Sequence, residues 1–237
     1  MNFDQRLISG EFIKRYKRFF VDIKVGNSII TAHCPNTGSM MGLLKKGNNV
    51  WLSKSDNPNR KLKYTLQIIE SQKSRVGINT HLTNKIVFNA LSKGIIKNLK
   101  NLSNIQQEVK FGKNTRFDFL LTKKTKKIFV EVKNVTLSRQ KNIAEFPDAI
   151  TSRGLKHILE LLKANKKGYE IYLLFVIQRN DCHKFKLAKD IDPEYCELLL
   201  KAVKKNLKIL CYDCKFFTKG IILNRKLKIK LNERKLY

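Results

Sequence analysis

The first part of the chain alternates between apolar and polar residues over several short segments. Turns rich in glycine and asparagine separate these segments, which is the pattern of short β-strands. The predicted strands are Phe19–Val25, Ile29–His33, Asn49–Leu52 and Tyr64–Ser71. Short strands at such close spacing are typical of a small all-β barrel. We therefore assign residues 1–80 to a first, all-β domain.

Helical spacing of apolar residues first appears after residue 80. It predicts helices over Thr83–Ser92, from a cap at Asp148 or Thr151 to about Asn165, and over Glu194–Lys205. Strands are predicted between and after these helices, at Glu108–Phe111, Tyr169–Gln178, Ile209–Tyr212 and Gly220–Leu223, with the alternating tail after Leu227 allowing one more. The continuous apolar run of the second of these strands is typical of a strand covered on both faces. It ends at Gln178 and Arg179, which we expect at the rim of a functional site. Residues 81–237 therefore form a second domain of α/β (α+β) class, closely joined to the first.

The stretch Asn114–Lys133 reads as two strands joined by a lysine-rich turn. Phe117, Phe119 and Leu121 share one face of the first strand, and Asp118 lies on the other. If the turn spans residues 122–127 and Leu121 pairs with Ile128, then Asp118 lies directly opposite Glu131. Directly opposed residues share a face, with Cβ atoms about 4.5–5.5 Å apart.

Two carboxylates placed in this way repel each other by up to about 1 kcal/mol. Either Lys133, two residues beyond Glu131, or a divalent cation offsets this cost. Mg²⁺ binds one or two carboxylates and leaves positions for phosphate oxygens. Such a cation polarises a phosphodiester and activates a water, with Lys133 near the nucleophile. The alternative is a hairpin edge whose charges face solvent.

Glu108 precedes this hairpin and is the third predicted metal ligand, beside Asp118 and Glu131. Arg116 has the same parity as Asp118 and is a candidate phosphate contact. A salt bridge from Arg116 to one of these acids is the alternative.

The order Asp, turn, Glu-x-Lys resembles the signature of the PD-(D/E)xK nucleases. More specific motifs resemble the sugar fermentation stimulation protein A (SfsA) family in order and spacing over nearly the whole chain. They are AHCPNTGSM (32–40), GINT (77–80), EVKFG (108–112), RFDFLL (116–121), EVKNVTL (131–137) and FPDAITSRGLKHILEL (146–161).

This resemblance implies an N-terminal OB-fold, a C-terminal PD-(D/E)xK-like domain and non-specific DNA binding. It makes Asp118, Glu131 and Lys133 the candidate catalytic residues, with Mg²⁺, or Mn²⁺ as its substitute, as the candidate cofactor. One position departs from the family pattern: Asn89 stands where other members tend to have Glu. Asn89 therefore removes a third carboxylate and weakens the prediction of a complete metal site.

The formal net charge is +30 and the pI is about 10.1. The direct interpretation is a nucleic-acid partner bound in a salt-dependent way. Lysine far outnumbers arginine, however, so AT-rich coding can account for about half of the excess. The candidate nucleic-acid contacts are Arg15, Lys17 and Arg18 in a basic-aromatic run, Asn36 in a turn, Arg116, and Arg153, Lys156 and His157 at the start of the second helix. An ordinary solvated face is the alternative for the basic-aromatic run and for the start of the helix. A structural turn is the alternative for Asn36, and a hydrogen-bonded structural histidine is the alternative for His157.

The sequence contains no apolar run of the roughly 18 residues that a membrane helix needs. The first residues lack the apolar core of a signal peptide. We therefore expect a cytoplasmic protein that does not enter a membrane, and the sequence does not define its oligomeric state. The five cysteines are expected to be reduced. Cys211-x-x-Cys214 has no second pair at the spacing of structural zinc, so no zinc is expected.

Three functional hypotheses remain open from the sequence. The first is a DNA-binding protein with a metal-dependent phosphodiesterase site. The second is a non-catalytic DNA-binding protein that regulates sugar metabolism genes or organises DNA. The third is an enzyme that acts on RNA or on a small phosphorylated molecule.

Overall fold

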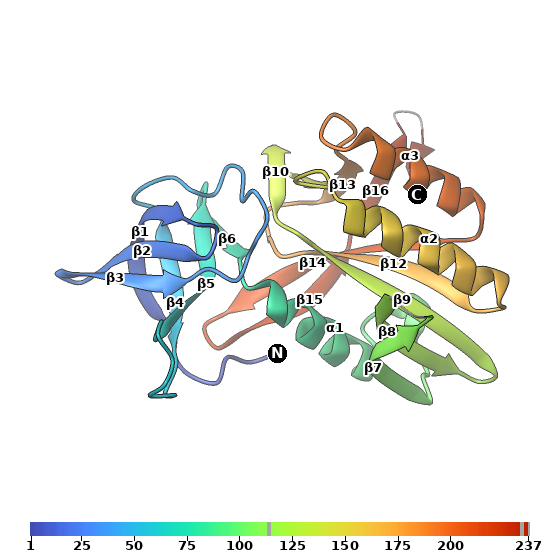
Figure 1. Cartoon of the computed structure of the whole chain (residues 1–237), viewed down its shortest axis with the longest axis horizontal. Coiled ribbons are helices and arrows are strands. Elements are labelled where there is room, and N and C mark those ends of the chain that lie inside the picture. Colours follow the sequence, from blue (N-terminus) through green and yellow to red (C-terminus); the bar gives the residue numbers. More distant parts are fainter. Residues whose placement is uncertain (113–114, 233–234, 237) are drawn as a thin grey trace.

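The computed structural model describes residues 1–112, 115–232 and 235–236. Its first domain is a barrel, seen in blue and cyan in Figure 1. The barrel strands are β1 (Ile8–Tyr16), β2 (Phe20–Val25), β3 (Ser28–His33), β4 (Asn49–Lys54), β5 (Tyr64–Ser71) and β6 (Ser74–Gly77). They pair in the order β3-β2-β1-β4-β5-β6. Strand β3 also pairs with β5, which closes β1 to β5 into a five-stranded barrel, and β6 pairs with β5 beside it. The predicted OB-like barrel is confirmed.

The sequence pattern predicted neither strand β1 nor the short strand β6 of this domain. Of the nine residues of β1 only Phe12 is fully buried, so the strand lacks the apolar alternation that marks a core face. A register shift between Phe12 and Lys14 interrupts its pairing with β2. The basic-aromatic run therefore covers the end of β1, a tight turn and the start of β2.

The second domain is built on a mixed sheet with the order β15-β14-β12-β9-β8-β7. Its strands are β7 (Asn104–Phe111), β8 (Thr115–Lys123), β9 (Lys126–Val135), β12 (Glu170–Ile177), β14 (Lys208–Phe217) and β15 (Gly220–Lys226). The central strand β12 pairs in parallel with both β9 and β14. The predicted Gly112–Thr115 turn includes Lys113 and Asn114, which lie outside the described residues.

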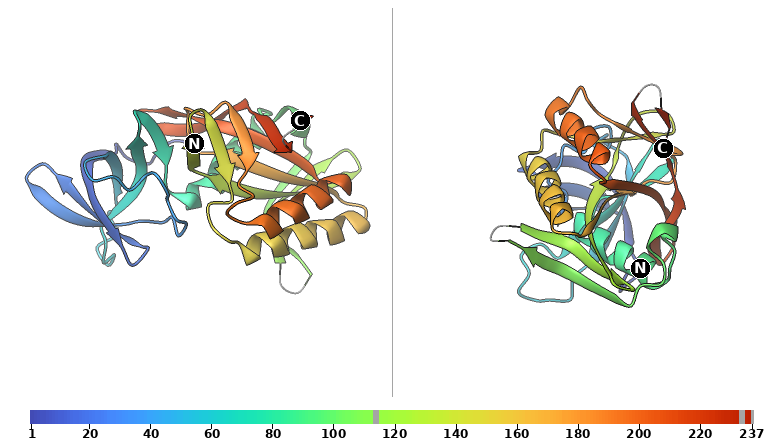
Figure 2. Two further views of the ribbon diagram at one scale, coloured as in Figure 1. Left: turned by 90° about the horizontal axis from the view of Figure 1, so that it is seen from above. Right: turned by 90° about the vertical axis from the view of Figure 1, so that its right-hand side faces the viewer.

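Helices cover both faces of this sheet. Helix α1 (Thr83–Ser92), between the short helices η1 (Thr80–Leu82) and η2 (Lys97–Leu99), packs on one face. Helices α2 (Ser152–Lys166) and α3 (Pro193–Lys204) lie side by side over the other face (Figure 2). The second sheet adds β10 (Leu137–Gln140), β11 (Ile143–Phe146), β13 (Lys184–Leu187), β16 (Lys228–Asn232) and β17 (Lys235–Leu236) beside α3. The predicted α/β class is confirmed.

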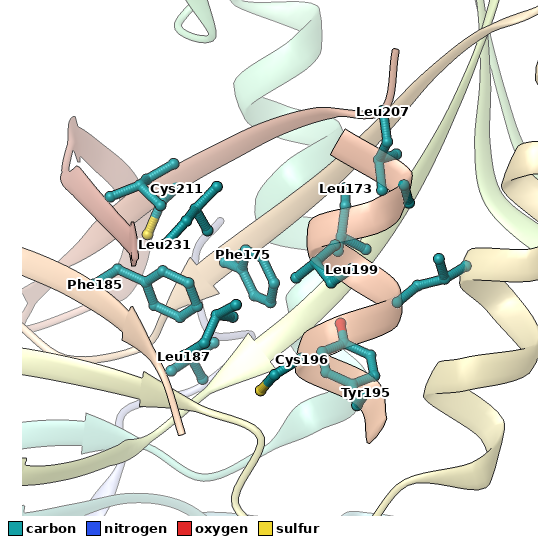
Figure 3. Packing of buried hydrophobic residues seen from close by; sticks show 14 of the residues in the cluster. Leu173, Phe175, Phe185, Leu187, Tyr195, Cys196, Leu199, Leu207, Cys211 and Leu231 are labelled. Carbon is teal, nitrogen blue, oxygen red and sulfur yellow. The ribbon is translucent and has the colours of Figure 1, made fainter. Parts of the chain in front are cut away.

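Strand β12 explains why this domain has a core on both sides. Leu173 and Phe175 face α2 and α3, whereas Leu174 and Val176 face α1. In Figure 3, Phe175 lies between Phe185 of β13 and a leucine of α3, with the two phenylalanine ring centroids 4.4 Å apart. Each such buried side chain contributes about 1.5–3 kcal/mol relative to exposure, so the continuous apolar run anchors the fold.

Asp192 ties the starts of α2 and α3 together. Thr151, one of the two predicted caps of α2, accepts a hydrogen bond from Gly154 N–H at 2.9 Å. Asp192 caps α3 by accepting from Tyr195 N–H through Oδ1, and it accepts from Thr151 N–H through Oδ2. Each helix cap of this kind is worth about 1 kcal/mol, so the position of α2 over the sheet is well determined.

The two domains share a hydrogen-bonded junction at Gln178, directly after β12. Gly77 N–H of β6 donates to the Gln178 carbonyl at 2.8 Å. The Gln178 side-chain amide donates to Thr83 Oγ1 at 3.0 Å and to Asn134 Oδ1 at 2.7 Å. At the other end of the barrel, Met1 and Phe3 pack against the second domain. The barrel is therefore closely joined to the α/β domain, as predicted.

The placement of Gln178 and Arg179 at the rim of the functional site is a prediction that the structure corrects. Both side chains are buried. Arg179 donates to both carboxylate oxygens of Asp181 and to the Thr136 carbonyl. Because these bonds and the barrel contact enclose it, Arg179 holds the junction rather than facing a ligand.

The cysteines are all free and buried. Cys211 belongs to the core on the α2 and α3 side of β14, whereas Cys214 belongs to the core on the α1 side. Their odd spacing on a strand directs them to opposite faces, so the pair cannot bind one metal ion together. Within the described part of the chain, no helix is long and apolar enough to span a membrane.

Candidate functional site

The hairpin of β8 and β9 has the predicted register over most of its length. Leu121 pairs with Ile128, and the pairing continues into the predicted turn as far as Lys123 and Lys126. Toward the site it ends at Phe119 and Val130. Beyond this pair, Asp118 Oδ2 accepts a hydrogen bond from Val132 N–H at 2.7 Å. The carboxylate thus replaces a backbone carbonyl as the acceptor for β9, and Asp118 does not pair with Glu131 in the sheet.

The change at Asp118 also alters which side chains share a face. Phe119 and Leu121 pack in the core on the α1 side, whereas Phe117 packs with Phe129 in the core on the α2 side. The expectation that Phe117, Phe119 and Leu121 share a face is therefore wrong. The side chains of β8 change faces where its backbone pairing with β9 ends, because Asp118 is hydrogen-bonded to Val132 of β9.

Asp118 is linked to helix α1 through Asn84. The Asn84 amide donates to Asp118 Oδ1 at 2.8 Å and to Glu108 Oε1 at 3.2 Å. Glu108 is exposed and has a left-handed φ of 54° on β7. Burial raises the pKa of Asp118 to about 7, and the Glu131 carboxylate adds to the rise. Asp118 is therefore a partly buried acid that titrates near neutral pH.

Glu131 is almost fully buried and lies between two cationic or polar partners. Lys133 Nζ lies 2.8 Å from Glu131 Oε1, and His157 Nδ1 of α2 also contacts this oxygen. Lys133 Nζ is 3.3 Å from His157 Nδ1. Burial alone would raise the pKa of Glu131, but Lys133 and His157 outweigh it and hold that pKa below its ordinary value. Glu131 is therefore ionised while its neighbour Asp118 holds a proton readily.

Two polar atoms near this cluster are buried without a hydrogen-bond partner among the described residues. They are Glu131 Oε2 and the Tyr195 hydroxyl at the start of α3. The Glu131 charge contributes to the raised pKa of Tyr195, after burial and the effect of Cys196, so the two groups lie within electrostatic reach. A carboxylate oxygen that is buried and unpartnered is costly, which makes Glu131 Oε2 a ready ligand for a cation.

The donor set fits a hard divalent cation with two protein carboxylates. Asp118 and Glu131 supply oxygen ligands, and Mg²⁺ is commonly bound by one or two carboxylates with waters and phosphate oxygens in its other positions. The third predicted ligand, Glu108, is separated from Asp118 by the Asn84 amide that bonds to both. Over residues 1–112 and 115–232, no group of three His, Cys, Asp or Glu residues is gathered closely enough to bind a metal ion.

The predicted contacts on the barrel divide into two kinds. Lys17 and Arg18 form the exposed turn between β1 and β2, both with positive φ. Arg15 instead donates to the carbonyls of Asn36 and Gly38. Asn36 is buried, and its side chain accepts from Gly38 N–H. Arg15 and Asn36 therefore hold the loop after β3, which reaches Asp148 of the second domain through Ser39.

The predicted contacts on the second domain also divide. Arg116 lies exposed at the start of β8, and Arg153 and Lys156 are exposed in the first turns of α2. His157 is 8% exposed and contacts Glu131. It therefore belongs with Asp118, Glu131 and Lys133, which we call the acid cluster, rather than to the outer surface. Arg153 Nε lies 3.5 Å from His157 Nε2 and extends the cluster toward solvent.

Sequence reasoning missed Asn84 and Tyr195. Asn84 lies in the first turn of α1, where its amide looks like an ordinary helix-start residue. Tyr195 lies three residues after the Asp192 cap and reads as a core aromatic. Asn84 bonds to residues of two distant strands, and the charge of Glu131 on a third strand acts on Tyr195, which no local pattern records.

A closed OB-like barrel joined to an α/β domain with an Asp, Glu-x-Lys cluster defines a two-domain protein of PD-(D/E)xK type. Family models match both parts: the SfsA N-terminal OB domain over residues 13–78 and the sugar fermentation stimulation protein RE domain over residues 81–220. The chain belongs to the sugar fermentation stimulation protein (SfsA) family.

Relatives match over almost the whole chain. A sugar fermentation stimulation protein homolog of Pelagibacter ubique is 56% identical, covering 97% of this chain and 99% of the relative. That of Maricaulis maris is 40% identical, covering 98% and 100%. The solved structure of Pyrococcus furiosus SfsA in complex with Ca²⁺ has a TM-score of 0.87 at 26% identity, covering 97% of this chain and 98% of that one.

Proposed function

We propose that this protein binds DNA without sequence preference and carries a divalent-cation site at Asp118 and Glu131 that supports phosphodiester cleavage. The observation that carries the proposal is a pair of carboxylates with opposite pKa shifts, Glu131 buried and Asp118 partly buried, next to Lys133 and with Glu131 Oε2 unpartnered. Perturbed carboxylates that face a common partner are typical of functional sites. The Ca²⁺ bound by the Pyrococcus furiosus relative supports the same choice of an oxygen-coordinated cation.

Each residue of the cluster has a separate task in this proposal. Asp118 and Glu131 hold the cation, and Mg²⁺ bound there supplies Lewis-acid polarisation of a phosphate oxygen. Lys133 keeps Glu131 ionised and brings a positive charge to the place where phosphate charge increases. His157 fixes the orientation of Glu131 from α2. Asn84 fixes Asp118 from α1.

The positive charge of the chain supports a nucleic-acid substrate. The net charge of +30 favours a polyanion, and exposed Lys17, Arg18, Arg116 and Arg153 lie on both domains. Phosphate contacts of this kind give affinity that falls steeply with salt and carry no base sequence information.

A second candidate function is DNA binding without chemistry. Asn84 favours it, because helix α1 contributes an amide to Asp118 rather than a third carboxylate. Asn89 supplies no carboxylate either, and its amide donates to the Lys85 carbonyl of its own helix. In that case the acid pair binds a cation that stabilises the fold, and the protein acts as a regulator or an architectural DNA-binding protein.

The deciding experiment measures cleavage and cation binding in the same preparations. Wild-type protein and Asp118→Asn are incubated with labelled single- and double-stranded DNA in Mg²⁺, Mn²⁺ or EDTA, and Ca²⁺ binding is measured by calorimetry. Metal-dependent cleavage lost in Asp118→Asn supports the nuclease. Ca²⁺ binding without cleavage under every condition refutes the catalytic part and favours the second candidate. A wild-type protein that binds no DNA refutes the proposal as a whole.

A further inference from the structure

A hollow lies between the barrel and helix α1, and we call it the junction pocket. It has a volume of about 850 Å³. Lys54 and Arg60 line it from the barrel, and Lys85, Phe88, Asn89 and Lys93 line it from α1. The N-terminal segment runs along the same region, and Figure 1 shows the N-terminus between β4 and α1. Both domains thus contribute to one site.

The chemistry of the junction pocket matches a nucleoside phosphate. Its lining carries four basic side chains and two acids, Asp4 and Asp56, and Asp56 already accepts from Gln5. Phe88, half-buried at the wall, offers an apolar surface, while Asn89 and Gln107 offer amides suited to base edges. The volume is in the range of small-ligand sites. A volume of this size can accommodate a single nucleotide.

Helix α1 and strand β7 connect the junction pocket to the acid cluster described above. Lys85 follows Asn84 in α1, and Asn84 donates to Glu108 and Asp118. Gln107, which lines the pocket, precedes Glu108 in β7. Two neighbouring elements therefore carry one residue into the pocket and the next residue into the cluster. Asp118, Glu131 and Lys133 do not line the pocket, so helix α1 and strand β7 connect the two sites only through these adjacent residues.

We infer that the junction pocket binds a nucleoside phosphate and that the substrate of this site is single-stranded. The inference rests on the proposed function, because it places one nucleotide of the strand in the pocket while a phosphate elsewhere on the same strand meets Asp118 and Glu131. Proteins that bind single strands combine a basic channel with apolar or aromatic platforms for the bases, which is what Phe88 and the four basic residues supply. The source of the nucleoside phosphate is either a strand or a free nucleotide.

A charge-reversal pair tests the inference against general electrostatics. Lys54→Glu with Lys93→Glu changes the pocket, and Lys24→Glu with Lys100→Glu makes the same change at exposed positions outside it. Full-length proteins are titrated with an oligo-dT strand, a DNA hairpin duplex and thymidine monophosphate, followed by fluorescence anisotropy or calorimetry. We expect single-strand affinity to fall about tenfold further in the pocket pair than in the control pair, with a salt slope lower by about 1.4. Duplex affinity should fall equally in both pairs.

A steric variant keeps the charge constant. Asn89→Trp fills the junction pocket, and Asn98→Trp adds the same side chain at an exposed position outside it. Loss of single-strand binding in Asn89→Trp alone supports the inference. Binding of thymidine monophosphate that Asn89→Trp also abolishes supports it with a free nucleotide as an additional source.

Two results separate failure of this inference from failure of the proposed function. If the wild type binds DNA but the pocket variants match their controls with every probe, the inference is wrong and the proposed function stands. If the wild type binds neither strand, duplex nor nucleotide, both are wrong. Circular dichroism of each variant checks that the fold is intact.

Discussion

Asp118→Asn should raise the stability of the protein above that of the wild type at alkaline pH but not at acidic pH. Burial and the Glu131 charge raise the pKa of Asp118 from 3.8 to about 7. An acid with a raised pKa in the folded state binds its proton more tightly there than in the unfolded chain. Its contribution to stability is therefore present below pH 3.8 and is lost as the pH rises through about 7.

The magnitude follows from the same shift. A rise from 3.8 to about 7 corresponds to about 4 kcal/mol of destabilisation at pH 8, at about 1.36 kcal/mol per pH unit. An asparagine keeps the acceptor for Val132 N–H but turns an amide toward Asn84, which costs about 1 kcal/mol. We therefore expect Asp118→Asn to lose about 1 kcal/mol near pH 4 and to gain about 3 kcal/mol at pH 8. For a chain of this length that is a rise in Tm of roughly 5–10 °C at the higher pH.

The assay is urea unfolding of wild type and variant from pH 4.5 to pH 8.5 in EDTA, with Asp56→Asn as the matched change at an exposed position. Mg²⁺ or Ca²⁺ added at pH 8 should remove most of the difference, because a cation at 100 times its Kd stabilises the wild type by about 2.7 kcal/mol. If the stability difference between variant and wild type is the same at every pH, the pKa of Asp118 is not raised and the reasoning is refuted. A cation that stabilises both proteins equally refutes its role as a ligand.

Three further substitutions test the cluster and the junction, each by urea or thermal unfolding. Lys133→Met should cost about 3 kcal/mol, because it leaves the Glu131 charge buried without its ion-pair partner; an unchanged midpoint would contradict the contact. Tyr195→Phe should be neutral or stabilising by up to about 1 kcal/mol, since its hydroxyl is buried without a partner, and a clear loss would mean that the hydroxyl is bonded. Gly77→Ala should cost about 1–3 kcal/mol, because a Cβ there collides with the Gln178 side chain; a wild-type Tm would show that the junction yields.

The alternation of residues within each strand predicted the hairpin well. The pairing of Leu121 with Ile128 follows from the period of two and the apolar sets on each strand. The hydrophobic pattern does not show where the pairing of the two strands ends. Asp118 accepts a backbone hydrogen bond from the neighbouring strand, and a side chain that replaces a ladder acceptor leaves no trace in hydrophobic periodicity.

Charged residues were harder to place than apolar ones. Arg15, Asn36 and Arg179 all looked like surface groups, yet each bonds to backbone carbonyls or amides inside the fold. A lysine-rich sequence makes this error common, because most of its charges are exposed and few features distinguish the exceptions. Burial of a polar side chain depends on which loop folds over it, and for these residues the partners come from loops, bends and the opposite domain.

The position of the acid cluster follows from a continuous set of contacts that begins in the barrel. Gly77 of β6 bonds to Gln178, and Gln178 bonds to Asn134, the residue after Lys133 on β9. Gln178 also bonds to Thr83, the residue before Asn84 on α1. One buried glutamine therefore fixes the two elements that present Lys133 and Asn84 to Glu131 and Asp118. Because the barrel strand is part of this set, the barrel and the acids keep a fixed position relative to each other.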